Sequence, residues 1–407
     1  MQKVILLFLL PIVSIFAQDF EIKSLHVYSD NETAAPMLFN NNGKTSGLTI
    51  EFDIRADYEP NLVILFKFCD RNWRPYDGLF LNNSGMNRTP TIWFDRLPLV
   101  VRGVQYHYKG NFPSEYVSFP FSGKWKFFIV ESNDYEKIFW TGKFYVVSNI
   151  IDLKSSITKD KLDAVTPSNY HSRALRIQTD FLLPDSLHNT RVEGIEIVRN
   201  REIENATVVS RNDNSNSRYY EWNGTNKFSF IARDILPGNE YRVTDIRNKE
   251  RFYPPETQAH LDGIELSRFY KYGPRDHNGA FILTNFNDDN SEYMDVLFQL
   301  RPPEINYDKD IFLVGSFTDW EVLPEFQLKN NEGLYSLYVE LKRGIYDYQY
   351  VTANLFREKF RDIDTIELEG NFWETENEFY IFLYYKSPLE GGYDQIIGFT
   401  KILSRGL

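Results

Sequence analysis

The sequence predicts an all-β protein made of immunoglobulin-like or early-set β-sandwich domains in tandem. Apolar and polar residues alternate over strand-length segments, and Gly, Pro, Asn or Asp interrupts these segments. Aromatic residues make up 16% of the chain, with 33 Phe and 26 Tyr, and this excess favours strands. No sustained apolar stripe has helical spacing, and only residues 159–165 (KDKLDAV) could form one or two helical turns.

The first 18 residues have the pattern of a secretory signal peptide. A short basic segment at residues 1–3 precedes an apolar run at 4–16, and cleavage is expected beside Ala17 or Gln18. The apolar run is shorter than the roughly 20 residues that a membrane-spanning helix needs. We therefore expect an exported chain, and its remaining length suggests two to four domains.

The first sandwich is expected at residues 19–150. The turn signal Ser122-Gly123 precedes a strand, a pattern that recurs in immunoglobulin-like sandwiches. The only cysteine, Cys69, ends an apolar strand, so we expect a buried structural thiol and no intramolecular disulfide. The candidate strands are residues 25–28, 48–54, 62–69, 104–108, 124–131 and 143–148.

The second and third sandwiches are expected at residues 151–276 and 277–407. No Ser/Gly-rich linker separates them, so we expect the three domains to pack into one elongated body. The polar segment 210–218 is interpreted as a hairpin tip. The candidate strands are residues 174–183, 192–200, 206–211, 227–232 and 241–247 in the second sandwich, and 281–286, 293–300, 310–320, 333–351, 370–386 and 396–403 in the third.

The charge balance and the motifs exclude several classes of function. Acidic residues number 57 against 45 basic residues, a net charge of −12, which disfavours nucleic acid and anionic lipid as partners. The chain has no GxSxG, P-loop, GxGxxG or HExxH motif. The six histidines form no local metal-binding pair. They are His26, His107, His171, His188, His260 and His277.

Two acidic segments are candidate sites. Residues 287–292 (NDDNSE) lack the glycine of a calcium-binding loop, so a solvated hairpin tip is expected there. The carboxylates of residues 362–370 could serve glycoside hydrolysis only at a suitable separation, which sequence does not give. We expect no catalytic residue, no metal and no cofactor.

Trp320 and Trp373 are the candidate carbohydrate-binding residues. They lie in the segments GSFTDW and GNFWETEN, where a flat aromatic ring could stack on a sugar. The alternative is that each anchors the fold through its large buried area. The sequence favours this packing role for Trp320 and leaves both interpretations open for Trp373.

The third domain carries one family resemblance and the whole chain carries another. GSFTDW (315–320) followed by LYVELKRGIYDYQYV (337–351) is similar to the starch- and glycogen-binding early-set sandwich, although the exposed Trp and Lys of that module's loop are missing after residue 351. The chain as a whole resembles the plug protein family of the type IX secretion system of Bacteroidota. This resemblance rests on FKFCDRNWRPYDG (66–78), FPFSGKWKFFIVE (119–131), DILPGNEYRVTDIRN (234–248), LEGNFWETENEFYIFLYY (368–385) and YDQIIGF (393–399).

The resemblance implies a non-catalytic periplasmic protein. Such a protein closes the periplasmic side of the outer-membrane translocon barrel while no cargo shuttle is bound. The implied partner is that barrel, with the membrane reached only through it, and with no nucleic acid and no small-molecule substrate. The alternative is a periplasmic or surface carbohydrate-binding protein that uses the C-terminal domain, and a third possibility is an accessory or cryptic glycosidase.

Overall fold

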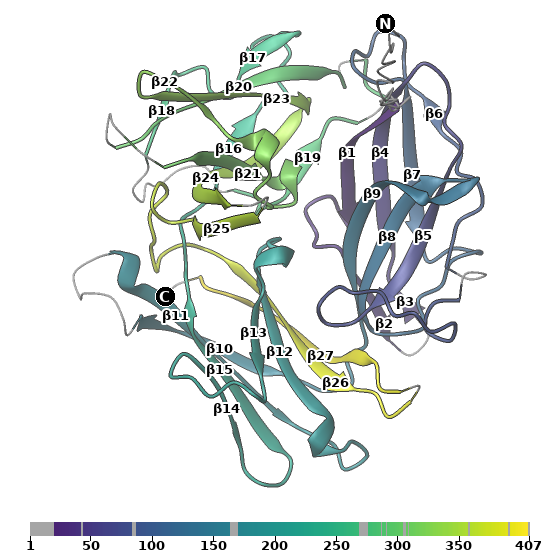
Figure 1. Cartoon of the computed structure of the whole chain (residues 1–407), viewed down its shortest axis with the longest axis vertical. Coiled ribbons are helices and arrows are strands. Elements are labelled where there is room, and N and C mark those ends of the chain that lie inside the picture. The colour runs from purple at the N-terminus through teal and green to yellow at the C-terminus, as the bar shows by residue number, and fades with distance from the viewer. Residues whose placement is uncertain are drawn as a thin grey trace, which may run out of the picture.

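The computed structural model describes residues 20–405 except 42–43, 84–86, 163–169, 268–275, 286, 290, 304–306, 308, 357–358 and 390. In this part of the chain every regular element is a β-strand or a single turn of 3-10 helix, which confirms the predicted all-β class. Figure 1 shows the strands gathered into three sandwiches. No helix within the described ranges is long and apolar enough to cross a bilayer. The expected signal peptide, residues 1–18, lies outside them.

The first sandwich contains the strands from β1 to β9. Its two sheets enclose a core of large aromatic side chains, among them Phe66, Trp125 and Phe127, which are completely or almost completely buried. One sheet has the order β1 (Phe20–Tyr28), β4 (Leu48–Ala56), β7 (Tyr106–Phe112) and β6 (Asp95–Arg96). The other has the order β3 (Lys44–Thr45), β2 (Met37–Asn41), β9 (Asp134–Val147), β8 (Gly123–Glu131) and β5 (Leu62–Cys69).

The second sandwich is built from two separate parts of the chain. One sheet has the order β10 (Lys154–Lys161), β11 (Arg173–Leu182), β15 (Lys227–Ile235) and β14 (Arg218–Trp222). The other has the order β13 (Thr207–Ser210), β12 (Val192–Arg199), β26 (Glu378–Lys386) and β27 (Asp394–Leu403). Figure 1 shows β26 and β27, in yellow, beside the teal strands β12 and β13.

The third sandwich is formed by the strands from β16 to β25. In one sheet β24 (Gly344–Phe356) pairs with β16 (Arg242–Asp245), β19 (Phe281–Leu283), β21 (Ile311–Gly315) and β25 (Lys359–Asp364). The other sheet has the order β17 (Glu256–Gln258), β20 (Tyr293–Arg301), β23 (Leu334–Lys342) and β22 (Lys329–Asn331), and β18 (Glu265–Leu266) also pairs with β20.

This pairing corrects the expected boundary between residues 276 and 277. Strand β16, which the sequence places in the second sandwich, belongs to the third. Strands β26 and β27, which the sequence places in the third sandwich, complete the second. The third sandwich is therefore inserted between β15 and β26, and residues 277–407 do not form one early-set domain. Alternation of apolar residues identifies a strand, but it does not identify the strand's partner.

Three local expectations also differ from the structure. Residues 159–161 lie in β10 and pair with β11, so they form a strand and not a helical turn, and residues 163–165 are outside the described ranges. Residues 210–218 connect β13 and β14, which belong to opposite sheets, so this segment is not a hairpin tip. Residues 287–292 likewise run between β19 and β20 of opposite sheets, with Asp288 and Asp289 exposed.

A buried ion pair joins the first sandwich to the second. Lys124 Nζ of β8 lies 2.7 Å from Glu196 Oε2 of β12, and both side chains are almost fully buried. Tyr145 of β9 donates a 2.8 Å hydrogen bond to Glu196 Oε1 and stacks on Phe382 of β26 at a ring separation of 4.3 Å. Separating the two sandwiches would leave these charges without partners, which is costly for buried groups.

A second buried network joins the first sandwich to the third. Asp53 Oδ2 of β4 accepts hydrogen bonds from Lys342 Nζ at 2.7 Å and from the Tyr293 hydroxyl at 2.8 Å. Asp53 Oδ1 lies 2.7 Å from His107 Nδ1, and all four side chains are buried. The two junctions fix the first sandwich against both others.

Candidate interaction surfaces

Potential metal ligands and the single thiol are the first groups to consider as sites of chemistry. No three His, Cys, Asp or Glu side chains among them are close enough to hold a metal ion. Cys69 is buried, as expected, and burial raises the pKa of its thiol to about 11. A thiol with such a pKa is almost entirely protonated near neutral pH and is a poor nucleophile.

Trp320 is a packing residue. Its side chain is only 3% exposed, and its indole Nε1 donates a 2.9 Å hydrogen bond to the backbone carbonyl of Gly279. The ring packs against Tyr241 at a centroid distance of 4.1 Å. A ring buried in this way offers no face on which a sugar could stack, which favours the packing interpretation of Trp320 over the carbohydrate-binding one.

Trp373 is half-buried and belongs to the second sandwich. Its Nε1 donates a 2.8 Å hydrogen bond to the Ala174 carbonyl, and its ring packs against that sandwich's core. The cationic groups of Lys159 and Arg173 lie over the ring at 5.8 and 5.4 Å from its centroid. These contacts make Trp373 an anchor of the 370–377 segment and do not favour a sugar-binding role.

Several exposed apolar side chains of the first sandwich lie close together in sequence, on its 91–104 segment. Val101 N donates a 2.9 Å hydrogen bond to Pro98 O, which closes a four-residue turn with Leu99 and Val100 at its two corners. Leu99 is 91% exposed and Val100 is 61% exposed, and nearby in sequence Trp93 is 82% exposed. Turn corners usually carry Gly, Asn, Asp or Ser, so two aliphatic side chains there are unusual.

The inner side of this turn is held firmly in place. Leu97, Val101 and Val104 form a small buried cluster with Tyr293 of the third sandwich. Gly103 has a φ of +94°, and a Cβ there would lie 2.8 Å from the Tyr293 Cβ, so only glycine fits this close approach. Because its inner residues are packed, the 98–101 turn presents Leu99 and Val100 rigidly to solvent.

Sequence reasoning missed these residues. The signal was present as the run LPLVV at residues 97–101, which is apolar without strand alternation and contains a proline. Such a run predicts a turn with apolar corners once the flanking strands are known. Leu79 and Phe80, in the long loop after β5, are also exposed, and Phe80 rests against Phe121.

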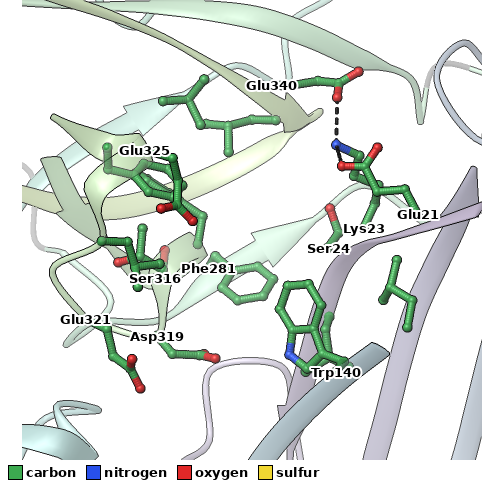
Figure 2. A pocket seen from close by; sticks show the side chains of 18 of the residues that line it. Glu21, Lys23, Ser24, Trp140, Phe281, Ser316, Asp319, Glu321, Glu325 and Glu340 are labelled. Atoms are coloured by element: carbon green, nitrogen blue, oxygen red, sulfur yellow. Dashed lines mark hydrogen bonds and ion pairs between the residues drawn. The ribbon is translucent and has the colours of Figure 1, made fainter. Parts of the chain in front are cut away.

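A cleft of about 740 Å³ lies between the first and third sandwiches. One wall comes from β1 and β9, and the other from β23, the start of β19 and the segment that follows β21. Figure 2 shows the rings of Phe281 and Trp140 close together in the cleft, with Asp319 to one side. Glu321 and Glu325 approach from the third sandwich, and Glu21 and Lys23 from β1.

The carboxylates of the cleft have unequal partners. Lys23 Nζ lies 2.6 Å from Glu21 and 2.9 Å from Glu340, and Arg55 pairs with the same two carboxylates. Lys143 pairs closely with Glu204, which lies just beyond the cleft, and lies 3.6 Å from Glu321. Among the described side chains, no cation within 4 Å pairs with Asp319 or Glu325.

Asp319 lies where all three sandwiches meet. Its backbone has a φ of +50°, a left-handed conformation that Asp and Asn tolerate better than most residues. Desolvation by the surrounding protein raises the pKa of its carboxyl to about 6, against the attraction of Arg201, although the residue still reaches solvent through the cleft. Most Asp319 side chains therefore carry a charge at neutral pH.

The comparisons with known proteins agree with the fold. A crystal structure of a hypothetical protein from Parabacteroides merdae aligns with a TM-score of 0.74 at 21% identity, covering 94% of this chain and 97% of that one. An alignment with a 1.5-MDa bacterial ice-binding adhesin, at 8% identity over 92% and 95% of the two chains, has a TM-score of only 0.13 and carries no argument. The search of curated proteins gave no match.

A protein-family model matches the first sandwich. Residues 22–148 match the model described as the type 9 secretion system plug protein 1st domain. The matched range includes all of β2 to β9 and nearly all of β1. The exposed 98–101 turn and all of one cleft wall except Glu21 fall within this range. The chain therefore contains, at residues 22–148, a domain similar to the first domain of type 9 secretion system plug proteins.

Proposed function

We propose that this protein is a non-catalytic plug that closes the periplasmic side of the outer-membrane type 9 translocon barrel while no cargo shuttle is bound. The match of residues 22–148 to the plug protein first domain carries the proposal. The proposed location is the periplasm, and the proposed partner is the barrel protein.

The buried junctions between the sandwiches support a stopper role. A body that blocks a wide pore must keep its shape against the contents of the pore. Lys124–Glu196 and Lys342–Asp53 are both buried ion pairs between sandwiches, and breaking a buried pair by removing one partner typically costs about 3–5 kcal/mol. These junctions resist bending of the first sandwich against the other two.

The 98–101 turn supplies the contact. Stable protein interfaces are anchored by a few apolar or aromatic side chains that enter pockets of the partner. Leu99 and Val100 project from a rigid turn, and Trp93 lies on the same loop segment. We propose that these side chains insert into the periplasmic rim of the barrel.

Recovery of the barrel from detergent-solubilised outer membranes tests the proposal. The immobilised protein is expected to capture the translocon barrel, identified by mass spectrometry. The double variant L99E/V100E should recover at least about fivefold less barrel, because it places charges in the apolar contact. Its stability should change by less than about 0.5 kcal/mol per site, since both residues are exposed.

A matched variant on the second sandwich provides the control. Leu182 and Leu389 are also exposed, so L182E/L389E adds the same two charges away from the turn. It should capture as much barrel as the unmodified protein. Failure of the unmodified protein to capture the barrel would remove the proposed partner, and equal losses in both variants would remove the proposed contact.

A further inference from the structure

The cleft between the first and third sandwiches has the features of a binding site. Its volume of about 740 Å³ exceeds what a single side chain of this protein would fill, and it is open to solvent. Its walls combine apolar or aromatic groups with carboxylates. Ligand-binding sites commonly have such a mixture of apolar surface and polar groups. The buried ion pair between Asp53 and Lys342 joins β4, the neighbour of β1, to β23 and so holds the two walls at a fixed separation.

One side of the cleft carries carboxylates that are not neutralised by an ion pair with any residue that the structure describes. Lys23 and Arg55 are engaged by Glu21 and Glu340 on one side. On the other side Asp319 and Glu325 have no ion-pair partner within the described part of the chain.

The cations near Asp319 offset only part of this negative charge. Arg201, which donates hydrogen bonds to the carbonyls of Val27 and Ala34, attracts Asp319. So does Lys143, which pairs with Glu204 and Glu321. The carboxylates Glu204, Asp319, Glu321 and Glu325 still outnumber these two cations. His26 adds no positive charge, because burial and then the Arg201 charge hold the pKa of its imidazole well below 6.5. A cationic group would therefore be attracted to the free side of the cleft.

Aromatic rings stand next to the free carboxylates. Trp140 of β9 is half-buried in one wall, and Tyr338 of β23 is 52% exposed in the other. Phe281 lies close to Trp140, on the side toward Asp319 (Figure 2). Ammonium and guanidinium groups are stabilised over aromatic rings, and the aliphatic stems of Lys and Arg pack on apolar surfaces.

We propose that this cleft binds a polypeptide segment through a lysine or arginine side chain, whose cationic end lies between Asp319 and Glu325 and whose stem packs on the aromatic walls. A bare metal ion fits less well, because no three potential ligands among the described residues come together there. The proposal concerns a site distinct from the 98–101 turn and does not depend on the translocon being the partner.

Calorimetric titration with a defined peptide tests the proposal. The probe is an acetylated, amidated hexapeptide of alternating Lys and Tyr, and the comparison peptide replaces each Lys by Glu. The Lys peptide should bind with one site per protein at low salt and weaken as salt screens the charges, whereas the Glu peptide should not bind.

Two variants locate the site. D319N/E325Q removes both free charges, and Asn tolerates the left-handed backbone at residue 319. Its affinity for the Lys peptide should fall about tenfold or more. The variant Y338S keeps every charge and removes an exposed ring, and a fall of about threefold or more is expected.

A control separates the cleft from the general acidity of the protein. D185N/E221Q removes the same two charges from exposed positions of the second sandwich, and its affinity should stay within about twofold of the unmodified protein. The proposal is overturned if the folded protein does not bind the Lys peptide, if D319N/E325Q binds it unchanged, or if the control loses as much affinity as D319N/E325Q.

Discussion

Asp347 is a carboxyl group in a place where a negative charge is costly. Its side chain is fully buried in β24, and its Oδ2 accepts hydrogen bonds from the backbone N–H groups of His277 and Gly279. Its Oδ1 has no partner in the described structure. Burial first, and then the charge of Asp276, raise the pKa of the Asp347 carboxyl to about 8, and Glu240 acts in the same direction.

This raised pKa makes stability depend on pH in a definite direction. The carboxyl has a pKa near 3.8 when unfolded and about 8 when folded, so the folded protein holds the proton more tightly. The stability that the protonated carboxyl contributes is complete below about pH 4 and is lost as pH rises toward 8. Glu240, whose pKa is raised to about 7 by burial first, adds to the same trend.

The variant D347N should remove part of this dependence. Asparagine keeps an acceptor for the two backbone N–H groups and carries no charge at any pH. It should match the unmodified protein near pH 4 and exceed it by more than about 1.4 kcal/mol at pH 8, the equivalent of one pKa unit. Urea unfolding at the two pH values measures this, and an advantage that does not grow with pH would contradict the assignment.

Single residues show what sequence reasoning could and could not reach. The burial of Cys69 followed from its place at the end of an apolar strand. Trp320 remained ambiguous because its burial depends on Gly279 and Tyr241, which are distant in sequence. The pairing of Lys342 with Asp53 spans the first and third sandwiches, so no local pattern reports it.

At the scale of elements, the strands were predictable and their partners were not. Strand β5 occupies the residues 62–69 that alternation and apolarity predict, because each side chain of a strand points to a known face. The pairing of β12 with β26 joins residues about halfway along the chain to residues near its end. Strands throughout the chain share the same two-residue alternation of apolar and polar side chains. This alternation therefore gives no signal for which distant strand each one pairs with.

A double-mutant cycle across this ladder tests the inserted arrangement. Ile195 of β12 lies directly opposite Leu383 of β26, and both are fully buried in the second sandwich's core. I195A and L383A should each cost about 2–5 kcal/mol of unfolding free energy. Because the two side chains share a core, the loss of unfolding free energy in the double variant should differ from the sum of the two single losses by at least about 0.5 kcal/mol.

The control pair uses a residue of the third sandwich. Leu313 of β21 is equally buried but belongs to a different core. The effects of I195A and L313A should add within about 0.5 kcal/mol. Coupling of Ile195 to Leu313, with none to Leu383, would contradict the assignment of β26 to the second sandwich.

At the scale of the whole molecule, the insertion explains how three sandwiches act as one body. The chain enters the third sandwich after β15 and returns to the second at β26. Two connecting segments of the chain therefore link the second and third sandwiches. The first sandwich is fixed to both by the buried pairs Lys124–Glu196 and Lys342–Asp53. Figure 1 shows the third sandwich placed beside the first and above the second.

The 98–101 turn and the cleft are two proposed binding surfaces with different chemistry, and the same junction between sandwiches holds both in place. The 98–101 turn packs on Tyr293 of the third sandwich, and the cleft lies between the same two sandwiches. The fixed junction therefore sets the position of both surfaces. The turn presents apolar groups to a partner, whereas the cleft presents carboxylates and aromatic rings.

Ionic current through the purified translocon barrel in a planar bilayer tests the plug proposal most directly. Adding the protein to the periplasmic side should reduce the current to near the level of the bare bilayer, and L99E/V100E at the same concentration should leave most of the current in place. A barrel that binds the protein and still conducts fully would contradict closure by this chain.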